Sequence, residues 1–227
     1  MLVVPRSQEL ALEKTRRHVN CGRMAGRDYW LSIASAPDAD DLREHILTGF
    51  KSGKPFTPYV PTIALPSPLG RVLDFGCGVG RTFPYLKRVA RHVTGFDLPP
   101  MIERCRALAA EPADQLLDDW AAARLSKFDL IVSVLVLQHI EPASCAEYVR
   151  DFASMAPVVY LLSRVDSDFG TNVFAQVAAA GVFEASECVE VDHDPRTHQL
   201  RVLGTRPFDE VCRPESSGHY EVLLRTR

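Results

Sequence analysis

Residues 71–81 read Arg-Val-Leu-Asp-Phe-Gly-Cys-Gly-Val-Gly-Arg, an apolar run that ends in a loop with glycine at every second position. The apolar part predicts a short strand, and residues 82–89 carry apolar side chains at helical spacing, which predicts a helix. A strand, a tight turn and a helix in this order are typical of a site that binds a nucleotide-like ligand. We expect the glycines to let the backbone approach the ligand, because side chains there would collide with it.

Downstream of Leu69, strand patterns alternate with helical ones, which predicts an α/β fold with a mostly parallel sheet. Residues 128–135 are almost all apolar or β-branched, as is typical of a central strand buried on both faces. The tail predicts strands at 188–191, 199–203 and 220–224, the last closing the sheet as an antiparallel strand. The other expected strands are 72–75, 92–96, 115–117 and 158–162, and the other expected helices are 100–110, 143–155 and 172–180.

The region before Leu69 lacks the alternation of strand and helix patterns that follows it. Helical patterns at about 7–20, 28–35 and 40–49 precede a proline-rich stretch, and its prolines discourage regular structure. We therefore expect residues 1–66 to form an N-terminal helical cap and residues 67–227 to form the principal domain. Tyr29 and Trp30 in the cap have two equal interpretations: a lid that excludes water from the site, or ordinary packing on the core.

Composition narrows the class of protein. The chain has 227 residues, 46% of them apolar and 24% charged, which is enough for one substantial core. Its net charge is −3 with acids and bases mixed along the chain, so we expect no nucleic-acid partner. No run approaches a membrane span or a signal peptide, which favours a soluble, cytoplasmic protein. The six cysteines form no C-x-x-C pair, which favours reduced structural thiols.

Asp97 ends the next predicted strand after the glycine loop. In an open α/β sheet this position places its carboxylate beside the loop, at the carboxyl edge of the strands. A carboxylate there can accept both hydroxyl groups of a ribose, so the pair of features favours a ribose-bearing cofactor. Arg81 stands where a dinucleotide fingerprint needs its last glycine, which disfavours a nicotinamide cofactor.

The glycine loop resembles motif I of the class I S-adenosylmethionine-dependent methyltransferases, whose fold is Rossmann-like. Four residues match that motif position by position: Asp74, Gly76, Gly78 and Gly80, with Cys77 between the first two glycines. The resemblance implies that S-adenosylmethionine is the cofactor and S-adenosylhomocysteine the product. It also implies that this loop wraps the methionine part of the cofactor, with the acid near its amino group.

The resemblance continues along the chain. Residues 93–97 resemble the second-strand motif, which implies that Asp97 binds the ribose and that Leu98 packs on the adenine. Residues 117–120 resemble the segment after the third strand, whose acid meets the adenine amino group. Its spacing favours Asp119 over Asp118, and Trp120 follows as a further candidate for cofactor contact.

Residues 128–140 resemble the fourth-strand motif of the same family, in which residues just past the strand lie beneath the cofactor. Val134 is the candidate for cofactor contact in this segment. His139 follows this strand and is a candidate general base, since imidazole titrates near neutrality. A packing or hydrogen-bonding role for His139 is the stronger alternative. A magnesium site of the catechol-methylating type would need an acid directly after the strand, and Val134 and Leu135 stand there, so we expect no metal.

The expected activity is transfer of the methyl group of S-adenosylmethionine to oxygen or nitrogen of a small molecule. The sulfonium is already activated, so positioning supplies much of the acceleration and the lack of an obvious catalytic triad is no objection. The alternatives are a methyltransferase acting on protein, peptide or tRNA, and a non-catalytic cofactor-binding partner subunit. The sequence predicts neither the oligomeric state nor the acceptor.

Overall fold

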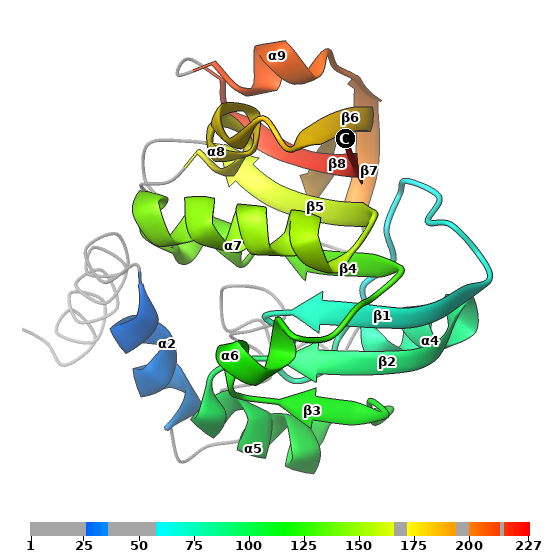
Figure 1. Cartoon of the computed structure of the whole chain (residues 1–227), viewed down its shortest axis with the longest axis vertical. Helices are drawn as coiled ribbons and strands as arrows, with labels where there is room; N and C mark the ends of the chain where they lie inside the picture. The colour runs from blue at the N-terminus through cyan, green and yellow to red at the C-terminus, as the bar shows by residue number, and fades with distance from the viewer. Residues whose placement is uncertain (1–25, 36–57, 166–171, 194–199, 214–215) are drawn as a thin grey trace, which may run out of the picture.

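The computed structural model describes residues 26–35, 58–165, 172–193, 200–213 and 216–227 (Figure 1). The helices expected near 7–20 and 40–49 lie outside the described residues. The described chain forms an eight-stranded sheet in the order β3-β2-β1-β4-β5-β8-β6-β7. Within the described ranges, no helix is both long and apolar enough to cross a membrane.

The first five strands pair in parallel, as the alternation of patterns predicts. The antiparallel end of the sheet follows, in which β8 pairs with β5 and β6, and β7 pairs with β6. The Rossmann-like fold with an antiparallel C-terminal strand is therefore confirmed. The strands are β1 (Leu69–Phe75), β2 (Ala90–Phe96), β3 (Gln115–Leu117), β4 (Leu130–Val134), β5 (Val158–Val165), β6 (Phe183–His193), β7 (Leu200–Thr205) and β8 (Gly218–Thr226).

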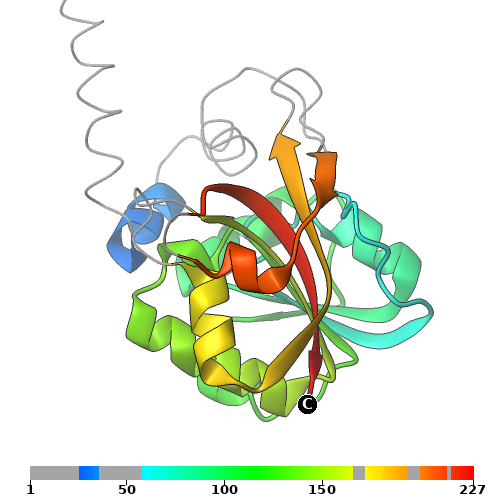
Figure 2. The ribbon, with the colours of Figure 1, turned by 90° about the horizontal axis from the view of Figure 1, so that it is seen from above.

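Helices cover both faces of the sheet, as Figure 2 shows from above. Alternate strand residues point to opposite faces, so β1 sends Leu73 into one core and Val72 into the other. The first core packs beneath α7 and α8, and the second beneath α4 and α5. The helices are α2 (Arg27–Ala34), α4 (Phe83–Val89), α5 (Pro99–Leu108), α6 (Trp120–Ala123), α7 (Pro142–Met155), α8 (Val173–Ala180) and α9 (Phe208–Val211), with a 3-10 turn η1 (Leu137–His139).

Helix α2 lies at the carboxyl ends of the parallel strands, on the side to which the arrowheads of β1 to β4 point in Figure 1. Its Ala34 is only 2% exposed and packs with Val79 of the glycine loop and Met101 of α5. The Arg104 Nε–H donates to the Ala34 carbonyl at 3.0 Å. The described part of the N-terminal region therefore covers the sheet edge where ligands of such folds bind.

A buried carboxylate ties the segment before β1 to the last strand. Glu221 of β8 is fully buried and accepts from the Tyr59 hydroxyl at 2.8 Å, from the Thr62 N–H at 2.9 Å and from the Ile63 N–H at 3.0 Å. Tyr59, Ile63 and Leu65 belong to the second core. Residues 58–66, which we expected to be part of the cap, thus pack with the sheet, and we propose that the principal domain begins before residue 58.

Replacing Glu221 should destabilise the fold measurably. In E221Q an amide nitrogen would face N–H donors of the 62–63 turn, so we expect the free energy of unfolding to fall by about 3 kcal/mol. Urea denaturation measures this change. Glu187 is exposed on the neighbouring strand β6, and the matched variant E187Q should change the free energy by less than about 0.5 kcal/mol. Equal effects of the two variants would contradict the assigned role of Glu221.

Candidate functional site

The glycine loop closes onto the end of β2 through backbone hydrogen bonds. The Gly76 and Cys77 N–H groups both donate to the Phe96 carbonyl, at 2.7 and 3.0 Å. The next loop donor, the Gly78 N–H, donates to Asp97 Oδ2 at 2.8 Å. The expected closeness of Asp97 to the glycine loop is therefore confirmed.

Asp97 is held as an acceptor by two main-chain donors. Besides the Gly78 N–H, the Leu98 N–H donates to its Oδ1 at 2.7 Å. Burial raises the pKa of Asp97 to about 6, and the two N–H groups act in the opposite direction. A carboxylate oxygen can accept more than one hydrogen bond. Each oxygen of Asp97 thus keeps capacity for a further donor, such as a ligand hydroxyl.

Asp74 is the second carboxyl group at this edge, at the end of β1. It is 1% exposed, and its Oδ2 accepts from the Thr82 hydroxyl. Burial raises its pKa to about 7, the Thr82 bond and the positive charge of Arg81 oppose that rise, and the negative charge of Asp97 adds to it. Two carboxyl groups with raised pKa values at one sheet edge mark a candidate binding site. A cationic ligand group would stabilise the charged form of Asp74.

The structure explains why positions 76 and 80 are glycine, and the explanation differs from the expected clash with a ligand. Both have positive φ values, 76° and 78°. A Cβ atom on Gly76 would lie 2.3 Å from a methyl group of Val136, and one on Gly80 would lie 2.5 Å from the Phe83 ring. Side chains at these two positions would collide with the protein itself, so the expectation of a clash with ligand is not needed to explain them.

Cys77 points away from the sheet edge. It is 5% exposed and packs in the second core, and its thiol interacts with Cys105 of α5. A hydrogen bond with the Cys105 thiol and burial both raise the pKa of the Cys77 thiol well above its usual value. The thiol of Cys77 thus belongs to the core, and cofactor contact by Cys77 stays a prediction.

The turn after β4 has an unusual backbone conformation. Leu135 adopts a φ of 59°, which an L-residue with a side chain rarely does, and its N–H donates to the Leu162 carbonyl at 2.8 Å. Such strained residues gather at functional sites. The preceding Val134 is partly buried and packs against the second core. The fourth-strand segment thus turns at the sheet edge where the sequence places the cofactor.

Leu98 lies beneath α2. It is partly buried and packs in the small cluster that Ala34, Val79 and Met101 form. An adenine ring on Leu98 would therefore also meet the N-terminal helix. The contact with adenine itself stays a prediction.

The hydrogen-bond and ring partners given for Asp119 and Trp120 lie outside the glycine loop. Asp119 is exposed and caps α6 by accepting from the Ala121 N–H at 2.9 Å. The Trp120 ring lies 5.1 Å from the Phe96 ring and 5.3 Å from the Phe75 ring, on the first-core face. Its indole N–H donates to Asp151 at 2.8 Å. The structure thus gives Trp120 a packing role, and only Asp119 of this pair presents an exposed polar group.

His139 lies in the η1 turn, with its ring centre 5.3 Å from that of Trp30. Gln138 accepts from the Arg164 N–H at 2.6 Å through Oε1, so its Nε2 is the amide donor that lies 3.3 Å from His139 Nε2. The neutral imidazole must then accept at Nε2 and carry its proton on Nδ1. Burial lowers the pKa of His139 to about 4, which makes it a weak base at neutral pH.

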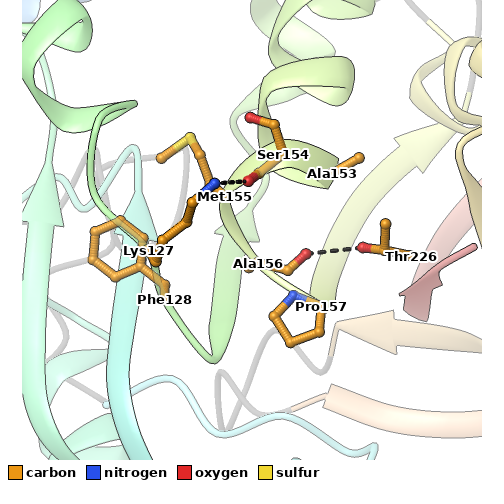
Figure 3. Close-up of a pocket in the computed structure, with 8 residues that line it drawn as sticks. All are labelled: Lys127, Phe128, Ala153, Ser154, Met155, Ala156, Pro157 and Thr226. Atoms are coloured by element: carbon orange, nitrogen blue, oxygen red, sulfur yellow. Dashed lines mark hydrogen bonds between the residues drawn. The ribbon is translucent and has the colours of Figure 1, made fainter.

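A shallow hollow of about 330 Å³ lies at the opposite end of the strands (Figure 3). Lys127 Nζ donates to the Ser154 carbonyl at 2.5 Å, and the Thr226 hydroxyl donates to the Ala156 carbonyl at 2.9 Å. These residues precede β4 and β5 or end β8, so the hollow faces away from the glycine loop. We assign it no part in the candidate site.

The ionisation of His139 can be measured directly. Nuclear magnetic resonance of the imidazole should show a neutral ring with its proton on Nδ1 at pH 7, which titrates near pH 4, because burial disfavours the charged form. The H139Q variant assigns the signal. A titration near the ordinary value of about 6.5 would contradict this account and favour an accessible base.

Three comparisons relate the chain to known proteins. Its fold is similar to that of the N-methyltransferase NodS from Bradyrhizobium japonicum WM9, solved in complex with S-adenosyl-l-homocysteine. That match has a TM-score of 0.50 and 16% sequence identity, and covers 70% of this chain and 78% of that chain. Magnesium protoporphyrin IX methyltransferase (ChlM) from Synechocystis PCC 6803, solved with bound SAM, aligns with a TM-score of 0.45 and 18% identity over 70% of this chain and 71% of that chain. A search of curated proteins gave no significant match.

A family model described as a methyltransferase domain matches residues 42–224. This range covers most of the chain and includes the glycine loop, Asp97 and the antiparallel end of the sheet. The chain therefore belongs to the methyltransferase-domain family, as its resemblance to class I S-adenosylmethionine-dependent methyltransferases implies.

Proposed function

We propose that this protein transfers the methyl group of S-adenosylmethionine to an oxygen or nitrogen atom of a small-molecule acceptor. Its family establishes the reaction class and the cofactor: the chain is an S-adenosylmethionine-dependent methyltransferase. The acceptor and the residues that bind each part of the cofactor are the proposed parts.

The groups at the carboxyl edge fit the cofactor chemically. S-adenosylmethionine carries an ammonium group and two ribose hydroxyls, and the edge offers two carboxyl groups with raised pKa values, the buried Asp74 and the partly buried Asp97. A ligand with one positive charge and two hydroxyls would compensate the burial of both groups. We assign the ammonium to Asp74 and the ribose to Asp97. The single observation that carries this assignment is the Gly78 N–H bond to Asp97 at 2.8 Å.

Other residues are proposed to complete the cofactor site. The backbone of Gly76, Cys77, Gly78 and Gly80 would line the methionine part. Leu98 would pack on the adenine, and the exposed carboxylate of Asp119 would meet the adenine amino group. Val134 would lie beneath the cofactor. The contacts of Trp120 with Phe96 and Asp151 favour support of this region over direct contact.

When bound, the cofactor supplies an activated methyl group, so the protein needs chiefly to orient the acceptor and exclude water. Trp30 of α2 contacts the His139 ring and packs on the cluster beside the glycine loop. This contact supports the interpretation of α2 as a cover over the site. A neutral, weakly basic His139 favours a hydrogen-bonding contact with the acceptor over proton abstraction.

Two features support a small acceptor over a polymer. The mixed charge with a net value of −3 gives no electrostatic footprint for nucleic acid. Helix α2 packs over the sheet edge through Ala34, which favours an acceptor that fits beneath a cover. Protein, peptide or tRNA methylation is the alternative.

The cofactor assignment predicts a binding defect in D97N. Loss of the charged acceptor should weaken binding of S-adenosylhomocysteine at least about tenfold in isothermal titration calorimetry, because hydrogen bonds to charged groups contribute about 1.5–3 kcal/mol. Asp114 also accepts a strand N–H, from Val93 at 2.7 Å, but lies at the start of β3. The matched variant D114N should keep its affinity within about twofold. Equal affinity of D97N and D114N would refute the assignment.

The acceptor class is tested with tritiated S-adenosylmethionine. Active protein incubated with a cell lysate should place the label in the low-mass fraction after separation by size. The D97N variant serves as the control for background transfer. Label that co-migrates with protein or RNA, and is lost on protease or ribonuclease treatment, would overturn the small-molecule proposal in favour of the alternative.

A further inference from the structure

Gln138, in the η1 turn that follows β4, is a buried amide that joins this turn to the end of β5. It is 4% exposed, and its Oε1 accepts from the Arg164 N–H at 2.6 Å and from the Ser163 hydroxyl at 3.4 Å. Strand β4 ends at Val134, which pairs with Leu162 of β5. The amide therefore supplies the acceptor for Arg164, two residues beyond the last paired residue of β5.

The same amide faces the ring of His139. Because Oε1 is committed to the Arg164 N–H, the donor Nε2 of Gln138 lies 3.3 Å from His139 Nε2. This ring nitrogen accepts, and the Nδ1–H of His139 is a donor, so any group that meets it, on the protein or on the methyl acceptor, must accept. The ring in turn lies edge-on to Trp30 of α2, with the planes at 71°. Contacts thus run from the end of β5 through Gln138 and His139 to the helix over the site.

Two roles of Gln138 can be separated by chemistry. A side chain that only satisfies the Arg164 N–H needs nothing but an acceptor, which a glutamate carboxylate would supply equally well. The contact with His139 needs the donor half of the amide, which a carboxylate lacks. Exchange of glutamine for glutamate therefore keeps the first contact and reverses the second.

We propose that Gln138 is a positioning residue on the acceptor side of the site: anchored to the end of β5, it holds His139 as a hydrogen-bond donor through Nδ1 and fixes the ring against which Trp30 packs. The inference rests on the proposed function, which brings His139 into contact with the acceptor. A neutral donor orients the acceptor without taking its proton, which agrees with a transfer that depends on positioning.

The tautomer of His139 tests this proposal. Nitrogen-15 nuclear magnetic resonance of the imidazole compares the native protein with Q138E at pH 8.5, far above the ordinary glutamate pKa of about 4.3. In the native protein Nδ1 should carry the proton. In Q138E the carboxylate still accepts from the Arg164 N–H but offers the ring no donor, so the proton should move to Nε2. We expect the ratio of the two tautomers to change at least about tenfold, because the native tautomer would set two acceptors against each other.

The matched control is S163A. It removes the longer of the two bonds to Oε1 and keeps the Arg164 N–H, so the tautomer should stay as in the native protein. A native ring with its proton on Nε2, or a Q138E ring that keeps its proton on Nδ1, would show that Gln138 does not orient His139, and the proposal would be wrong.

The link to α2 has its own signal. The chain has two tryptophans, and the indole N–H of Trp120 donates to Asp151. In Q138E the indole N–H resonance of Trp30 should shift while that of Trp120 stays in place, with W30F assigning the first. An unmoved Trp30 resonance would contradict the part of the proposal that concerns α2.

A second variant keeps the test decisive if Q138E does not fold. Q138M keeps the length of the side chain and has neither half of the amide. The tautomer ratio should then shift toward protonated Nε2 by about fivefold, the effect of losing one hydrogen bond. An unchanged ratio in Q138M would overturn the proposal.

The consequence for the reaction is measured separately. Gln138 contacts η1 and β5, whereas the cofactor is assigned chiefly to the ends of β1 and β2, so Q138E should bind S-adenosylhomocysteine within about twofold of the native affinity. Its transfer of tritium from S-adenosylmethionine to the low-mass fraction of a lysate should fall at least about tenfold. Native transfer with a reversed tautomer would refute the role toward the acceptor. Absence of S-adenosylhomocysteine binding to the native protein would instead overturn the proposed function, because the tautomer is read on the protein without ligand.

Discussion

The hydrogen bond between the Gly78 N–H and the Asp97 carboxylate is the contact on which the candidate site depends. It joins the glycine loop after β1 to the end of β2, at 2.8 Å. The carboxylate is partly buried there, and among the described residues two main-chain N–H groups donate to it. A partly desolvated acid in this state costs stability in the free protein. A ligand that supplies hydroxyl donors offsets that cost, and this is the physical basis for a ribose site.

The second constraint is the chain of buried polar groups that runs from β8 to the loop. Glu221 accepts a hydrogen bond from the Tyr59 hydroxyl, and the Tyr59 ring lies under the Arg81 guanidinium. The C-terminal strand, far from motif I in sequence, is thereby linked to the residue that follows the glycine loop.

Much of the fold could be predicted from the sequence, because hydrophobic periodicity reports which side chains face a core. The structure has β4 where the pattern predicts a strand at 128–135, and α7 where it predicts a helix at 143–155. The predicted glycine stop after the helix at 172–180 is Gly181, whose φ is 65°. Helices α6 and α9 have four residues each, too few for a periodic pattern. The packing of residues 58–65 with the sheet was missed, because prolines mark irregular backbone and say nothing about burial.

The site was predictable where a motif names residues and unpredictable where contacts cross the sheet. Motif spacing correctly predicts that Asp97 lies beside the glycine loop. It gives no sign that Val136 requires glycine at position 76, that Leu135 adopts a positive φ, or that Glu221 and Tyr160 support Tyr59. These features depend on tertiary packing between distant segments. A buried glutamate in an otherwise apolar C-terminal strand, Tyr220 to Leu224, is the one signal in the sequence that could have pointed to the last of them.

The most direct measurement is a crystal structure of the protein with S-adenosylhomocysteine. The account predicts that both ribose hydroxyls lie within hydrogen-bonding distance of the Asp97 carboxylate and that the amino group of the ligand faces Asp74. Density for the ligand at any other place, such as the hollow beside Lys127 and Thr226, would contradict it.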